Sequence, residues 1–265
     1  MITFIVPLRS KVNSTNWERI SSLCENTLQS LTAQRKGGCN VLLVCHERPT
    51  LRVVPSGVEI IEADFEPPSP EQFAERDADK WRKLRLGMVA AARQNPEYVM
   101  FVDADDCLDI GLAELVRSNR PSHGMILRNA YRYTLGEKWA YRSNNNCGTN
   151  ALIRCSSISL PRSLDADEIA KCLPLMSGHT NIEEKMLSAG LRLDQVSRYL
   201  VLNSQYPEQH SRLAHADLCN VVPTLRMRLG ALRRACYVGQ RFAQRFGVEK
   251  SQLRASQHSR DSVQW

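Results

Sequence analysis

The chain has 265 residues, 43% of them hydrophobic, enough to bury a sizeable core in one large domain with an appendage. No apolar run reaches the roughly 18 residues that a membrane span needs, and the nine cysteines form no CxxC pair, which argues against a zinc ribbon or a disulfide framework. The N-terminus lacks the pattern of a secretory signal, so we expect a cytoplasmic protein with free thiols.

The net charge of +7 comes almost entirely from the C-terminal part of the chain. Residues 216–265 contain nine Arg or Lys against three Asp or Glu, which leaves residues 1–215 close to neutral. We therefore expect a main domain over 1–215 and a basic tail over 216–265. The tail contains no recognised nucleic-acid motif, so nucleic acid is disfavoured as a partner.

The first half of the chain alternates short apolar runs with helical patterns. Apolar, β-branched runs ended by turn residues predict buried strands, and capped segments with apolar residues three or four apart predict helices. The predicted strands are Ile2–Val6, Val41–Cys45, Val58–Glu62 and Tyr98–Val102, and the predicted helices are Asn13–Gln34 and Asp79–Arg93, with a proline-rich loop at Asp64–Pro70. This order is typical of an α/β fold with a mostly parallel sheet.

The second half is less regular. Met125–Leu152 has a mixed, strand-like pattern that indicates a substrate-facing region, Glu183–Ala189 predicts a short helix, and Leu191–Leu202 predicts a strand pair or a strand and loop. In residues 216–247, Leu and Phe recur at three- to four-residue steps with Arg between them. This pattern predicts a basic amphipathic helix or helical pair, which either lies on an anionic membrane surface or packs on the domain.

The acidic run Asp103-Ala104-Asp105-Asp106 directly follows a predicted apolar strand. Ligands of open parallel sheets bind at the carboxyl ends of strands, and side-chain alternation would direct Asp103 and Asp105 to one side. Mn²⁺ or Mg²⁺ can be held by one or two carboxylates together with substrate phosphates. The alternative is that Asp105 or Asp106 caps a helix predicted near Leu108–Val116.

Residues Tyr98–Asp106 resemble the apolar strand and Asp-x-Asp-Asp motif of glycosyltransferase family 2. Further similarities, in matching order over residues 1–212, are Phe4–Pro7, Lys80–Ala92, Asn181–Glu184 with Ala189–Arg192, and Gln209–Ser211. The resemblance implies a GT-A fold, a mixed sheet flanked by helices, with a helical C-terminal appendage. It also implies a metal-dependent, inverting transferase that moves a sugar from a nucleotide donor, UDP-sugar favoured, to a glycan or lipid-linked acceptor, with a basic tail at the inner face of the membrane.

The resemblance assigns roles to individual residues. It implies nucleotide-sugar binding by Pro7, Arg9, Glu47, Lys80, Arg85, Asp103 and Ala104, and metal binding by Asp105 and Asp103 with His210 as an additional ligand. Lys80, Lys83 and Arg85 precede the acidic run and are expected to approach diphosphate oxygens. A solvated helix face is the equally weighted alternative for each of these three cations.

Two departures from the family pattern affect the expected chemistry. Glu184 lies where the family usually has the acid of a Glu-Asp pair, the general base, and Glu183 is the fallback, although capping boxes led by Thr180 and Asn181 offer each glutamate another role. Cys45-His46-Glu47 lies where members of the family often have aspartates that recognise the nucleotide base. These changes leave open a catalytically degenerate nucleotide-binding or scaffold protein. A dehalogenase-like phosphatase is disfavoured because its motif lies near the N-terminus and continues differently.

Overall fold

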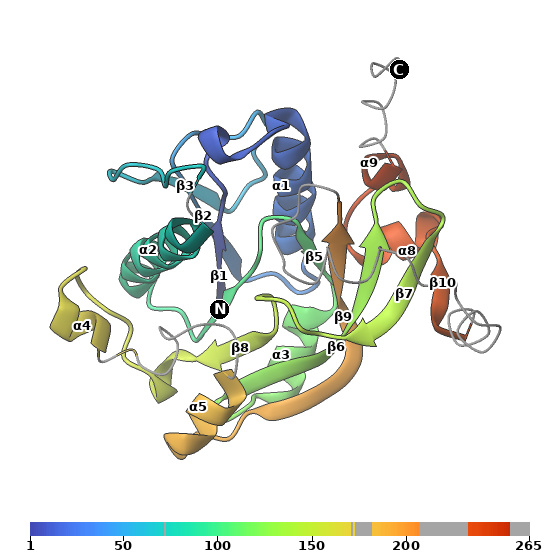
Figure 1. Ribbon diagram of the computed structural model, residues 1–265. Helices are drawn as coiled ribbons and strands as arrows, with labels where there is room; N and C mark the ends of the chain where they lie inside the picture. The colour runs from blue at the N-terminus through green and yellow to red at the C-terminus, as the bar shows by residue number, and fades with distance from the viewer. Residues whose placement is uncertain (72, 171, 173–181, 207–232, 255–265) are drawn as a thin grey trace.

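The computed structural model describes residues 1–71, 73–170, 172, 182–206 and 233–254, which fold around one mixed sheet (Figure 1). The strands are β1 (Ile2–Pro7), β2 (Cys39–Cys45), β3 (Val58–Glu62), β4 (Tyr98–Phe101), β5 (Asp106–Leu108), β6 (Gly124–Thr134), β7 (Trp139–Asn144), β8 (Ala151–Arg154), β9 (Asp194–Gln205) and β10 (Ala235–Tyr237). The α-helices are α1 (Trp17–Thr32), α2 (Phe73–Gln94), α3 (Leu112–Asn119), α4 (Ala166–Ala170), α5 (Ile182–Ser188), α8 (Gln240–Arg245) and α9 (Lys250–Arg254).

The sheet has a parallel half and a largely antiparallel half. Its strand order is β10-β7-β6-β8-β4-β1-β2-β3, in which β3, β2, β1 and β4 run parallel, and β8 is antiparallel to β4. Strand β9 runs parallel to β6 and pairs with β5 on its other edge. The predicted α/β class, with a mixed sheet flanked by helices, is therefore confirmed.

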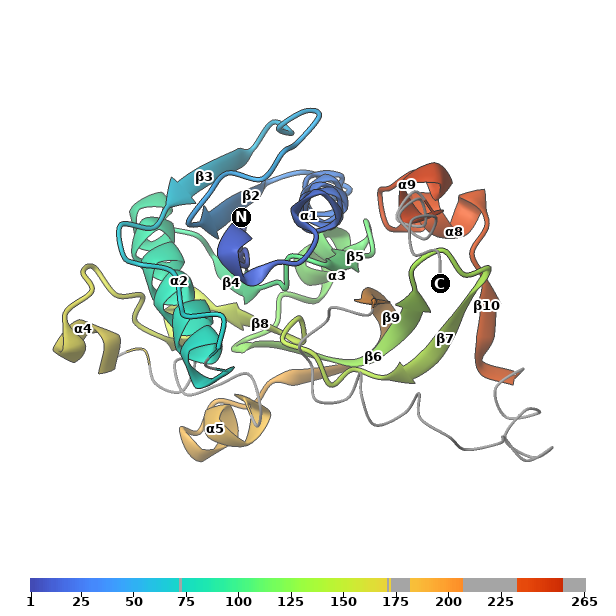
Figure 2. The same ribbon diagram turned by 45° about the horizontal axis from the view of Figure 1, so that its top comes forward.

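Helices cover both faces of the parallel half (Figure 2). Helices α1 and α3 pack on one face through a core that includes Phe4 and Leu43, and α2 and α5 pack on the other through a core that includes Ile5. Helix α2 approaches the sheet closely at Gly87, where a Cβ atom would lie 2.4 Å from Ile5 Cγ2. Fully apolar strands thus form because both of their faces are buried.

The predicted elements of the first half are confirmed with shifted ends. Helix α1 begins at Trp17 rather than near Asn13, because the Asn16 side chain caps it by accepting a hydrogen bond from Arg19 N at 2.8 Å. Helix α2 starts at Phe73, six residues before the predicted start at Asp79. In the second half, the sequence predicts a strand pair or a strand and loop over Leu191–Leu202, and the structure has a short loop followed by one long strand, β9. The mixed Met125–Leu152 region contains β6, β7 and the start of β8.

The expected amphipathic helix or helical pair over 216–247 is interrupted by a strand in its described part. Residues 235–237 form strand β10 on the edge of the sheet, between helical residues 233–234 and the helix Gln240–Arg245, so one continuous helix is wrong there. Phe242 and Phe246 are buried against β6 and β7, so this segment packs on the domain. Residues 207–232 lie outside the described residues, and a membrane contact by that stretch stays a prediction. None of the described helices is both long and apolar enough to span a bilayer.

Candidate functional site

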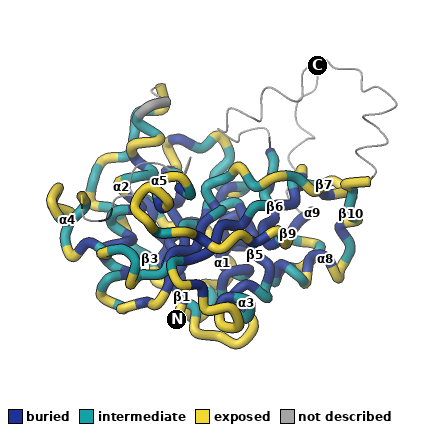
Figure 3. Tube along the Cα trace, turned by 90° about the horizontal axis from the view of Figure 1, so that it is seen from below, coloured by how far each residue is buried: buried dark blue, intermediate teal, exposed yellow. Residues whose placement is uncertain are grey.

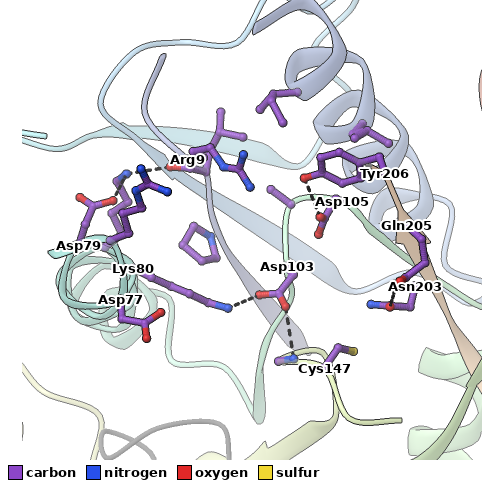
Figure 4. A pocket seen from close by; sticks show the side chains of 18 of the residues that line it. Arg9, Asp77, Asp79, Lys80, Asp103, Asp105, Cys147, Asn203, Gln205 and Tyr206 are labelled. Atoms are coloured by element: carbon purple, nitrogen blue, oxygen red, sulfur yellow. Dashed lines mark hydrogen bonds and ion pairs between the residues drawn. The ribbon is translucent and has the colours of Figure 1, made fainter. Parts of the chain in front are cut away.

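A cavity of about 630 Å³ opens at the carboxyl ends of β1 and β4 (Figure 4). Its walls are the loop after β1, the first half of α2, the acidic run after β4, the loop between β7 and β8, and the ends of β6 and β9. Ligand sites of α/β sheets lie at this edge because loops from several strands meet there. The volume is that of a pocket for a nucleotide-sized ligand.

Asp103 and Asp105 both line this cavity, but the backbone between them is not extended. Asp106 N donates to Asp103 O at 3.0 Å and closes a turn, so a turn rather than strand alternation brings the two carboxylates to one side. Asp103 Oδ1 lies 2.5 Å from Lys80 Nζ, and Asp105 Oδ2 accepts from Tyr206 Oη at 3.0 Å. Figure 4 shows these partners facing each other across the cavity.

Asp106 points away from the cavity into the core. Its oxygens accept hydrogen bonds from Thr149 Oγ1 at 2.5 Å and Asn203 Nδ2 at 2.7 Å, and Thr149 Oγ1 also accepts from Asp103 N at 2.9 Å. Asp106 therefore ties the acidic turn to the β7–β8 loop and to β9. The helix-capping alternative is wrong, because α3 begins after Gly111 without a side-chain cap from either aspartate.

The aspartates of the acidic run lie close enough to affect one another's pKa values. Burial first, and the Asp103 carboxylate second, raise the pKa of Asp105 from 3.8 to about 6. Burial and the two neighbouring aspartates also raise the pKa of Asp106. Burial lowers the pKa of Lys80, but attraction by Asp103 and Asp105 outweighs it and leaves the pKa above its usual value. The site therefore concentrates negative charge that a cation relieves.

The donor set fits a small divalent cation of the Mg²⁺ or Mn²⁺ type. Among the described residues, no three His, Cys, Asp or Glu side chains gather into a metal-binding group. Of the four carboxylates that line the cavity, Asp103 and Asp105 of the acidic run offer oxygen ligands, and such ions commonly take one or two carboxylates plus phosphate and water. Lys80 pairs with Asp103, so a divalent ion at this carboxylate would compete with the lysine ammonium.

Gly148 lets the β7–β8 loop close over Asp103. Its backbone N donates to Asp103 Oδ2 at 3.3 Å, and a Cβ atom at this position would lie 2.8 Å and 3.0 Å from the two carboxylate oxygens. The Gly148→Ala variant should therefore displace Asp103 and weaken nucleotide binding about tenfold, measured by calorimetric titration with UDP and GDP in Mn²⁺.

The matched control for this variant is Gly111→Ala. Its added Cβ also meets a carboxylate, Asp109 Oδ1 at 3.0 Å, but lies outside the cavity. We expect nucleotide affinity to be retained in this control. Equal affinity of wild type and Gly148→Ala would contradict the role assigned to the loop.

A buried ionic cluster supports the wall of the cavity formed by α2. Asp79 Oδ1 lies 2.7 Å from His46 Nε2, and Asp79 Oδ2 lies 2.7 Å from Lys83 Nζ. Lys83 Nζ also donates to Leu8 O at 2.8 Å, which ties α2 to the loop after β1. Burial lowers the pKa of Lys83, against the opposing attraction of Asp79. Because Asp79 and Lys83 both have partners within the cluster, they hold α2 against the loop after β1 without leaving an unpaired buried charge.

The structure brings most of the predicted nucleotide-sugar residues together. The cavity is lined by Pro7, Arg9, Lys80, Asp103, Ala104 and Asp105. Glu47 and Arg85 are not among its lining residues: Glu47 Oε2 instead accepts from Lys11 N at 2.9 Å, and Arg85 Nε is buried without a hydrogen-bond partner in the described part of the chain. His210 lies outside the described residues.

The two predicted base candidates lie at the start of α5, outside the cavity lining. Glu183 forms an ion pair with Arg128 and accepts from Gln195 Nε2 at 3.1 Å, whereas the Glu184 side chain is exposed. Helix α5 is nonetheless near the site, because Ile182 and Gly148 line the same small cavity under the β7–β8 loop. Both capping residues proposed for these glutamates, Thr180 and Asn181, lie outside the described residues.

Several cavity residues were not predicted individually, although Ser143 and Cys147 fall in the Met125–Leu152 region that the sequence predicts to face the substrate. The others reach the cavity only through the tertiary structure, and they are Asp79, Asn203, Gln205 and Tyr206. A hydrogen-bonding pattern such as Tyr206 to Asp105 joins residues about one hundred positions apart, so no local spacing predicts it.

No family model matches the chain, and no curated protein is similar to it in sequence. The chain is similar in structure to residues 1–349 of S. aureus TarS, at 14% identity and a TM-score of 0.43 over 77% of this chain and 60% of that one. It is also similar to the 2-C-methyl-D-erythritol 4-phosphate cytidylyltransferase of Francisella tularensis, at 10% identity and a TM-score of 0.44 over 79% and 93% of the two chains. Mouse xyloside xylosyltransferase 1 is similar at 13% identity and a TM-score of 0.35 over 73% and 78%. These partial likenesses assign neither a reaction nor a substrate.

Proposed function

We propose that this protein is a metal-dependent GT-A glycosyltransferase that moves a sugar from a nucleotide-diphosphate donor to an acceptor hydroxyl. The observation that carries the proposal is the cavity at the carboxyl ends of β1 and β4, where the paired carboxylates of Asp103 and Asp105 lie together with Arg9 and Lys80. Such a mixture of acids and cations suits a diphosphate that binds with a divalent ion.

The donor would occupy the cavity with its diphosphate near the acidic turn. Arg9 and Lys80 line the cavity, and arginine and lysine are the usual protein ligands of phosphate. A UDP-sugar is the favoured donor. Asp105 and Asp103 would hold a Mn²⁺ or Mg²⁺ ion, which when bound neutralises negative charge on the departing diphosphate. Such an ion would also offset the repulsion from Asp103, which adds to burial in raising the pKa of Asp105.

The transfer would follow a single, inverting displacement. The acceptor hydroxyl gives its proton to a glutamate, its oxygen forms a bond to the anomeric carbon, and the bond from that carbon to the diphosphate breaks with its electron pair leaving on the phosphate oxygen. Glu184 is the preferred base, because its carboxylate is exposed, while that of Glu183 already pairs with Arg128. Inversion rests on the family resemblance, and NMR assignment of the product anomer tests it.

Glutamine variants distinguish the two glutamates. Glu184→Gln should lower kcat about 100-fold or more with nucleotide affinity unchanged, because a base is lost and the donor site is intact. Glu183→Gln should keep most of the activity, since it only weakens the ion pair with Arg128. Steady-state kinetics on both variants, with calorimetric nucleotide titration, provide the measurement. A full loss in Glu183→Gln with an active Glu184→Gln would reverse the assignment.

The decisive test of the function is nucleotide binding followed by turnover. Calorimetric titration with UDP and GDP, each with and without Mn²⁺, should show metal-dependent binding of one nucleotide, and the matching nucleotide sugar should then be hydrolysed or transferred. The alternative is a nucleotide-binding protein without transfer. It is favoured by one observation, the ion pair that engages Asp103 with Lys80, and it predicts nucleotide binding with no donor turnover.

A further inference from the structure

One face of the antiparallel half of the sheet leads from the cavity to an exposed edge. The register places Asn203 of β9 opposite Arg132 of β6, Arg132 opposite Tyr141 of β7, and Tyr141 opposite Ala235 of β10. Directly opposed residues share a face of the sheet. Asn203 and Arg132 line the cavity, so the cavity floor and the outer strands β7 and β10 belong to one continuous surface.

This surface carries three exposed aromatic side chains, which we call the aromatic face. Trp139, Tyr141 and Tyr237 are 46%, 43% and 51% exposed, and the rings of Trp139 and Tyr237 meet edge to face with centroids 5.5 Å apart. Figure 3 shows exposed residues along β7 and β10 at one end of the molecule. Large aromatic side chains grouped on a monomer surface commonly mark a binding site.

The core of the domain does not account for these aromatic residues. The opposite face of the same strands carries Tyr131, Tyr133 and Ala140, and that face is buried against Phe242 and Phe246. Among the described residues, the strands therefore bury one side, and the aromatic face is the side that stays exposed. Between it and the cavity lie the polar side chains of Arg132 and Ser143 and the small side chain of Ala130.

We propose that the aromatic face binds the acceptor as a chain of sugar residues whose end reaches the cavity. Sugar rings have apolar C–H faces that pack on aromatic rings, and their hydroxyls bond to polar side chains such as Arg132 and Ser143. From β9 to β10 the surface crosses three strand spacings, about 14 Å, which accommodates several sugar units. The inference rests on the proposed transferase function, because it is the cavity that makes this surface an acceptor site.

A flat face of a sheet suits a saccharide chain better than a lipid bilayer. Aromatic residues that enter a membrane lie on protruding loops or on amphipathic helices, whereas Trp139 and Tyr141 project from a strand that continues into the cavity wall at Ser143. In the described part of the chain, the apolar stripe of α8 is buried and leaves no companion surface for a bilayer.

The test is calorimetric titration of the full chain with four probes: cellohexaose, maltohexaose, chitohexaose and a hyaluronan hexasaccharide, each with saturating nucleotide and Mn²⁺. We expect at least one hexasaccharide to bind, and its affinity to fall about tenfold or more in Trp139→Ala and in Tyr237→Ala. Trp139→Phe and Tyr237→Phe should bind within about threefold of wild type, since an aromatic surface remains. Leu187→Ala, an equally exposed apolar site on α5, is the matched control.

Several outcomes would overturn the inference. They are the absence of hexasaccharide binding to wild type, unchanged affinity in the alanine variants, and aromatic-dependent binding to phosphatidylglycerol vesicles in place of saccharide. UDP and GDP titrations on the same samples separate this failure from failure of the proposed function. If nucleotide binds but no saccharide binds, only the acceptor role of the aromatic face is refuted. If saccharide binds but neither UDP nor GDP binds, the transferase function is refuted. Thermal unfolding of each variant shows that β10 remains folded.

Discussion

Replacing Asp105 by asparagine is expected to remove metal-dependent nucleotide binding. Asp105 lines the cavity and its Oδ2 is held by Tyr206 Oη at 3.0 Å, an arrangement that an amide can copy without supplying the negative charge that a divalent ion requires. We expect the affinity for the bound nucleotide in Mn²⁺ to fall at least about 100-fold, or about 3 kcal/mol, by calorimetric titration.

The same substitution should stabilise the metal-free protein. The folded-state pKa of Asp105 is raised from 3.8 to about 6, so its ionisation weakens the fold as the pH rises through about 6, and the protonated form carries no such cost below about 4. The asparagine variant should therefore have a free energy of unfolding about 1–3 kcal/mol higher than wild type at pH 7.5 in EDTA, with a difference that disappears near pH 4. Urea unfolding at the two pH values measures it.

Asp77→Asn is the matched control for both measurements. Asp77 also lines the cavity, but it lies on α2 and its side chain is exposed, so neutralising it should change neither metal dependence nor stability substantially. If Asp105→Asn bound nucleotide with unchanged metal dependence, the acidic turn would not be the metal site.

The second large effect is expected for Phe246→Ala, far from the cavity. Phe246 is 0% exposed and packs near Tyr131 and Phe242, with ring centroids 6.2 Å and 5.2 Å away. Its neighbour Arg245 pairs with Asp109, whose side chain is only 8% exposed, and donates to Tyr199 O at 2.5 Å. Truncating the ring should lower the free energy of unfolding by about 3–5 kcal/mol, as measured by urea denaturation.

Arg241→Ala on the same helix is the control, because Arg241 is exposed and its removal should change stability by no more than about 0.5 kcal/mol. A Phe246→Ala protein as stable as this control would mean that residues 240–254 are an independent appendage. The expected loss instead makes this segment part of the fold, as the burial of Phe242 indicates.

The local sequence was sufficient wherever one element makes its own signal. The apolar runs of β1, β2 and β4 predicted strands because these strands are largely buried on both faces, and the acidic run after β4 predicted a cavity edge because strand ends meet there. Strand β3, predicted as buried too, is instead partly exposed at the edge of the sheet. The family resemblance, rather than a local pattern, grouped Pro7, Arg9 and Lys80 with Asp103 and Asp105, and all five line the cavity.

The rest depended on contacts between distant segments. Phe242 and Phe246 have the spacing of an amphipathic helix whether they face a membrane or a sheet. They pack on the sheet because β6 and β7 have an apolar face that these two side chains cover. Tyr206 and Asn203 reach the acidic run because β9 pairs with β5 and β6, a pairing that no local pattern encodes.

The sequence by itself determined the α/β class, the parallel half of the sheet and the position of the acidic run, because burial on both faces and turn residues leave periodic local signals. The tertiary structure alone decided that a turn, and not an extended strand, aligns Asp103 with Asp105, and that Glu47 and Arg85 fall outside the cavity. It also decided that β10 completes an aromatic face, since the partner of an edge strand is chosen by packing across the whole sheet.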